Sequence, residues 1–61
     1  MSQISEKELA TITDLLAGED LLVKKFQMLA EHADNEELKG KMLSIAGKHQ
    51  GHFNELYAKL S

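Results

Sequence analysis

The chain has 61 residues, no cysteine, no proline and a formal net charge of −3 at pH 7. This length allows one small domain, residues 1–61, and a domain of this size usually needs disulfides, a metal or oligomerisation for stability. The missing cysteines exclude disulfides, and the mildly acidic charge argues against nucleic acid as a partner. No apolar run approaches the roughly 20 residues of a membrane helix, and the first residues lack a signal-peptide pattern, so we expect a cytoplasmic protein.

The first predicted helix spans about residues 6–33. Ser5 and Glu8 have the spacing of a capping box, in which each side chain bonds the other residue's backbone N–H group. Apolar residues then recur at three- and four-residue steps, which is the period of one helix face. The members of this face are Leu9, Ile12, Leu16, Val23, Phe26, Ala30 and Ala33. A flanking row that widens the stripe consists of Leu15, Leu22 and Leu29.

The second predicted helix spans about residues 36–60, after a turn at residues 34–35. Asp34 or Asn35 can cap this helix, and the acidic residues that follow suit its positive N-terminal end. Its apolar face consists of Leu38, Met42, Ile45, Ala46, Phe53, Leu56 and Leu60. The short connection predicts an all-α, antiparallel two-helix hairpin.

Two helices alone leave much of each apolar stripe in water. We therefore expect a homodimer that closes into a four-helix bundle, with a higher oligomer as the alternative. The back of the second helix carries a strip of small residues, which is either a solvated face or a surface for closer assembly. That strip consists of Gly40, Ser44, Gly47, Gly51, Asn54 and Ala58. A sparse apolar strip on the back of the first helix consists of Ala10, Ala17, Leu21 and Met28.

Three polar residues interrupt the apolar seam. Glu19 stands in the stripe of the first helix, and His49 and His52 stand in that of the second, so both histidines are expected to point inward. With the turn at 34–35, Glu19 is level with Gln50, between the two histidines. A two-fold axis would then bring two copies of this polar layer together.

The coincidence of a carboxylate and two imidazoles in one layer predicts a metal site. A buried carboxylate is costly unless it is paired, and this ligand set suits Zn, Fe, Mn or Ni. The alternative is a hydrogen-bonded layer without metal that fixes helix register and dimer geometry. His32 is expected to be exposed at the end of the first helix, and Glu55 is expected to be solvated or to support His52.

The sequence contains no Ser-His-Asp constellation and no phosphate loop, so covalent and phosphoryl-transfer catalysis are not predicted. Four segments resemble the small spore coat proteins of endospore-forming bacteria, which are related to the spore coat protein F family and to ferritin-like bundles. These segments are Ile4–Leu9, Asp14–Glu19, Leu22–Lys25 and Lys48–Phe53.

The resemblance implies a ferritin-like half-bundle that dimerises. Glu19 matches the first-helix carboxylate of ferritin-like metal proteins and His52 matches the histidine of their Glu-x-x-His motif, but His49 stands where that motif has glutamate. This departure argues against a carboxylate-bridged di-iron centre and favours Zn or a weakly held metal. The resemblance thus implies a non-enzymatic structural protein, in the spore coat and with other coat proteins as partners. The alternative is a small ferritin-like metalloprotein with a metal-storage or redox role.

Overall fold

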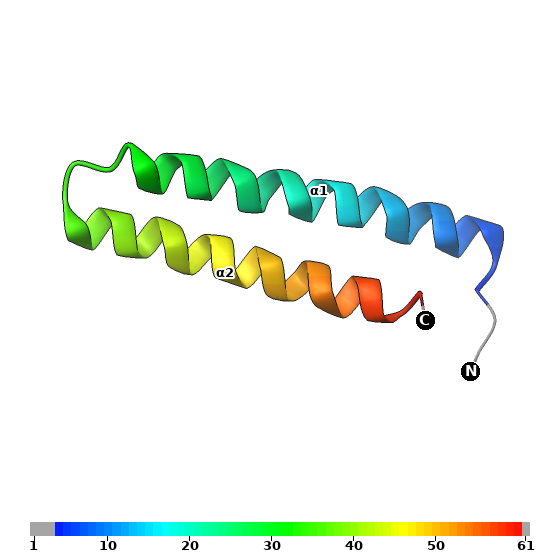
Figure 1. Ribbon diagram of the computed structural model, residues 1–61. Coiled ribbons are helices and arrows are strands. Elements are labelled where there is room, and N and C mark those ends of the chain that lie inside the picture. The colour runs from blue at the N-terminus through cyan, green and yellow to red at the C-terminus, as the bar shows by residue number, and fades with distance from the viewer. Residues whose placement is uncertain (1–3, 61) are drawn as a thin grey trace.

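The computed structural model describes residues 4–60, which form two antiparallel helices packed side by side (Figure 1). Helix α1 runs Glu6–Glu31 and helix α2 runs Glu36–Ala58. The described part of the molecule measures about 47 × 17 × 10 Å, because the two helices lie lengthwise against each other and nothing covers them. The predicted all-helical hairpin is confirmed.

Local sequence signals determine where α1 begins. The Ser5 hydroxyl accepts a hydrogen bond from the Glu8 N–H group at 3.1 Å, and the Ser5 N–H group donates to Glu8 Oε1 at 3.0 Å. These two bonds are the capping box that the sequence predicts. The hydrogen bond from the Ser5 N–H group stabilises the ionised carboxylate and is the largest cause that lowers the pKa of Glu8 below its ordinary value, with the Ser5 side chain as the second.

The hairpin turn is set by the cap of α2. The Asn35 side chain accepts a hydrogen bond from the Leu38 N–H group at 2.8 Å, so Asn35, rather than Asp34, is the N-cap. Helix α1 ends at Glu31 rather than at residue 33, and His32 caps it. Helix α2 ends at Ala58 rather than at residue 60, and both ends therefore stop slightly short of the predicted range.

The interface between the helices is thin. Among residues 4–60, only Val23, Ala30 and Ala46 are buried, and all three side chains are small. No large side chain in that range is fully buried. A packed core normally encloses several large apolar side chains. The single hairpin therefore has only a narrow line of buried residues between its helices and no complete hydrophobic core.

One side of the hairpin carries two regular rows of incompletely buried apolar residues. Leu9, Leu21, Met28, Leu43 and Tyr57 are exposed outside these rows. Each helix contributes a row with seven-residue spacing, and residues seven apart lie on nearly the same line of a helix. We call these two rows the open apolar face, which consists of Leu15, Leu22, Leu29, Leu38 and Ile45. All five are exposed or only partly covered. Both rows are offset from the seam in the same rotational sense, and in antiparallel helices this places them on the same side of the hairpin.

Substitution of an interior glycine of α2 tests whether the back face of this helix is packed or solvated. A Cβ atom added at Gly47 meets nothing within 4 Å in the single hairpin. If this face is solvated, Gly47→Ala should raise the free energy of unfolding by about 0.5–1 kcal/mol, because alanine loses less backbone entropy in a helix. Urea denaturation monitored by circular dichroism measures the change. A destabilised variant, or one with fewer associated copies, would instead show that another helix packs against the small-residue strip.

Neither helix of the described chain is long and apolar enough to cross a membrane.

Candidate metal centre

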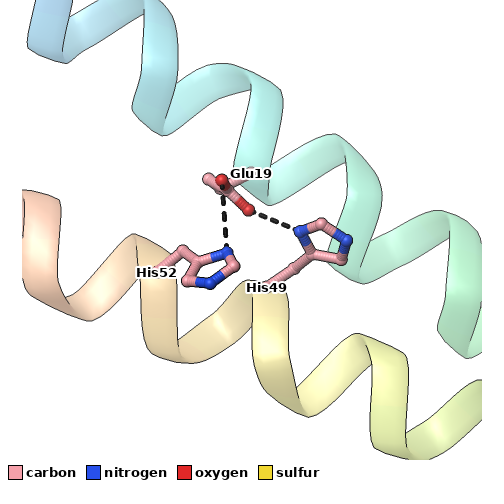
Figure 2. Close-up of polar contacts among 3 residues, drawn as sticks. All are labelled: Glu19, His49 and His52. Carbon is pink, nitrogen blue, oxygen red and sulfur yellow. Dashed lines mark hydrogen bonds and ion pairs between the residues drawn. The ribbon is translucent and has the colours of Figure 1, made fainter.

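Three ionisable side chains meet near the middle of the two helices. Glu19 extends from α1 toward α2, and His49 and His52 extend back from successive turns of α2 (Figure 2). The two histidines lie three residues apart, so they share one side of the helix. The antiparallel pairing brings Glu19 level with the gap between them, as the register of the hairpin predicts.

The contact between Glu19 and His49 is the shortest of the group. Glu19 Oε1 lies 2.6 Å from His49 Nδ1, and about four-fifths of each side chain is covered, with exposures of 20% and 23%. A carboxylate can only accept a hydrogen bond, so Nδ1 of His49 carries the proton and donates it. This bond pairs Glu19 with His49, which offsets much of the cost of placing these two polar groups in the seam.

His52 lies at the edge of the same cluster. Its Nδ1 atom is 3.6 Å from Glu19 Oε2, beyond the usual range of an N–H···O hydrogen bond, and its side chain is 55% exposed. Both histidines therefore point toward Glu19 as expected (Figure 2), but only His49 is mostly covered, and His52 stays at the edge of the interface in the single hairpin. The physical reason is position: His52 continues the row of Leu38 and Ile45 at seven-residue spacing, and that row borders the seam instead of filling it.

Aromatic contacts hold the two imidazole rings. The Phe26 ring stacks on the His49 ring with a centroid separation of 6.0 Å and an interplanar angle of 12°. The rings of His49 and His52 meet edge to face at 5.6 Å and 83°. Sequence analysis assigned Phe26 to the apolar stripe without linking it to the site. The seven-residue spacing between Glu19 and Phe26, which places both on the same line of α1, could have indicated that Phe26 lies beside the site.

The three side chains lie close enough together to hold a metal ion. Glu19, His49 and His52 can each offer one ligand atom, and these atoms lie within 4.8 Å of one another. An ion with bonds of about 2.1 Å holds tetrahedral ligand atoms about 3.4 Å apart, so side-chain shifts on the order of 1 Å suffice. Two imidazoles and one carboxylate suit Zn or another first-row divalent metal and leave a further coordination position open.

The other predicted accessory residues lie outside the cluster. His32 is exposed at the C-cap of α1, as expected. Glu55 is exposed on α2, and no contact between it and His52 is observed.

Comparisons with known proteins give no family for this chain: no family model, no curated protein and no solved structure matches it.

Proposed function

We propose that this protein is a non-enzymatic structural module that pairs with a second copy through its open apolar face and holds a divalent metal ion at Glu19, His49 and His52. The observation that carries the metal assignment is the convergence of one carboxylate and two imidazoles from separate helices within 4.8 Å. The pairing would form a homodimeric four-helix bundle.

The surface area of the chain supports association with a second copy. A compact monomer of 6.8 kDa exposes about 4,000 Å². This hairpin exposes 4847 Å². The excess is close to the roughly 800 Å² that each partner buries in a standard stable interface. In a dimer, each chain would therefore bury about as much surface area as other domains of its size bury as monomers.

The position of the open apolar face supports the same pairing. The two rows interleave along the hairpin, so that side chains from α1 and α2 alternate in level from Leu15 to Leu38 near the turn, with His52 filling the α2 position between Leu15 and Leu22. Such a continuous strip is self-complementary under a two-fold axis, as a C2 interface requires. A partner hairpin would bury exposed residues of this strip, including Leu15, Leu29 and Leu38.

The chemistry of the cluster argues against a carboxylate-bridged, redox-active di-metal centre. A carboxylate-bridged di-metal centre in a helical bundle uses several inward carboxylates, whereas each chain here brings two histidines and one glutamate to the layer. Imidazole-rich sites suit Zn, and they bind Fe or Mn less firmly. The resemblance of four sequence segments to small spore coat proteins gives the setting that we propose for such a module.

Elemental analysis and mass measurement test this function directly. Protein purified without chelators or a histidine tag should carry close to one zinc, iron or manganese ion per chain and should have the mass of a dimer by light scattering. Loaded with zinc, it should release the ion as the pH falls, because protons compete with metal for imidazole and carboxylate ligands. A monomer that takes up none of these metals on addition would contradict the proposal.

The competing ferritin-like function has a different readout. A metal-storage or redox protein should bind iron and consume oxygen or peroxide as it does so. We expect the iron-loaded protein to show no such consumption above that of free iron. Turnover in an oxygen electrode would replace the structural assignment with the redox one.

A further inference from the structure

We infer that metal binding and dimerisation are coupled through His52, so that the ion strengthens the dimer and the dimer strengthens ion binding. This inference rests on the proposed function, because it assumes both the metal site and the pairing through the open apolar face. It adds a regulatory property: the metal supply would control the assembly of the protein.

The first observation is the place of His52 in the hairpin. It continues the α2 row of the open apolar face, seven residues after Ile45. In the register set by its contact with Glu19, it lies between the levels of Leu15 and Leu22 on α1. The only imidazole on this side of the described chain thus lies between two apolar positions of α1 that a second copy would cover.

The second observation is that His52 lacks a firm polar partner in the single hairpin. Its Nδ1 atom is 3.6 Å from the nearest Glu19 oxygen, while His49 occupies the other oxygen at 2.6 Å. The nitrogen atoms of its exposed ring therefore form their hydrogen bonds mainly with water. A partner hairpin that covers the face must remove this water, which opposes association because the ring then loses hydrogen bonds without replacement.

A metal ion changes that balance. An ion shared with Glu19 and His49 would draw the His52 nitrogen into the cluster and satisfy it there. When a second copy then covers the open apolar face, the His52 ring has few hydrogen bonds to water left to lose. The apolar contacts around the ring can form without that free-energy cost. Because the coupling free energy between binding events is reciprocal, the factor by which the ions strengthen the dimer equals the combined gain in affinity of its two ions, so each ion gains the square root of that factor.

Three charged side chains near the cluster do not provide an alternative partner for His52. Lys24 is engaged by Asp20 at 2.9 Å, and this pair lies on the opposite flank of α1. Lys48 carries the same charge as a protonated imidazole and is exposed. Only Glu19 has an oxygen within 4 Å of a His52 nitrogen as an ion-pair partner among residues 4–60.

Sedimentation equilibrium over a range of protein concentrations tests the coupling. Zinc at saturating concentration should lower the dimer dissociation constant of the wild-type chain by about tenfold or more. His52→Leu should abolish this zinc effect and, without metal, should dimerise at least as tightly as the wild type, because leucine fits the apolar row. Isothermal titration of the wild type should give tighter zinc binding above the dimer dissociation constant than below it.

His32→Ala is the matched control, because His32 is an exposed histidine far from the cluster. The zinc effect should persist in this variant, and its loss would mean that zinc bridges copies through His32. Zinc bound with an unchanged dimer dissociation constant would overturn the coupling and leave the proposed metal site intact. The absence of zinc binding would overturn both proposals. Circular dichroism on each sample establishes that the helices are present.

Discussion

Glu19→Gln should lose at least about 100-fold in zinc affinity while keeping the helical hairpin. The amide oxygen of glutamine can still accept the hydrogen bond that His49 donates at 2.6 Å, so the layer stays satisfied without metal. The amide is neutral and a poor ligand for zinc, however, so the ion loses the only anionic ligand of the cluster. Isothermal titration with zinc measures the affinity, and circular dichroism measures the helix content.

Glu55→Gln is the control for this substitution. It makes the same chemical change at an exposed carboxylate three residues after His52. Zinc affinity should stay within about twofold of the wild type if Glu55 is solvated, as its exposure indicates. Equal affinity in the wild type and in Glu19→Gln would remove Glu19 from the ligand set. The layer would then be interpreted as a hydrogen-bonded device that fixes the register of the helices.

Leu15→Glu should convert the dimer that we propose to a dissociated chain. Leu15 is 49% exposed in the single hairpin and belongs to the open apolar face, so the substitution removes little from the hairpin itself. In a two-fold dimer it would bury two unpaired carboxylates. At a cost of several kcal/mol, dissociation should become at least about 1,000-fold more favourable. Sedimentation equilibrium measures the constant.

The matched control is Leu21→Glu. Leu21 is 68% exposed and lies on the back of α1, away from both α2 and the open apolar face. The same substitution there should leave the dimer dissociation constant within about threefold of the wild type, as surface changes usually do. If Leu21→Glu dissociates the protein and Leu15→Glu does not, the sparse back strip of α1 is the true interface.

Leu15→Glu should also lower the stability of the helices, because the hairpin has so little core. Within residues 4–60, the three buried side chains are a valine and two alanines, and few isolated domains of this size are stable on such a core. Thermal unfolding of this variant should become broader and should shift to lower temperature. A sharp, unchanged transition would mean that the single hairpin is stable and that its dimer is not needed for folding.

The sequence by itself determined the parts of this protein that depend on neighbouring residues. The capping pair Ser5 and Glu8 and the helical period of the apolar residues predicted both helices, because capping bonds and amphipathic faces are local properties. The short turn also predicted antiparallel pairing. From that register alone, Glu19 could be placed level with the two histidines.

Only the tertiary structure decided how these residues meet. Seam positions look alike in a periodic pattern, but the rotation of each helix about its axis decides which of them face the partner and which border it. That rotation places a mostly covered His49 against Glu19 and Phe26 and leaves His52 more than half exposed on the edge. The distinction depends on side-chain packing across two helices distant in sequence, which no local pattern encodes.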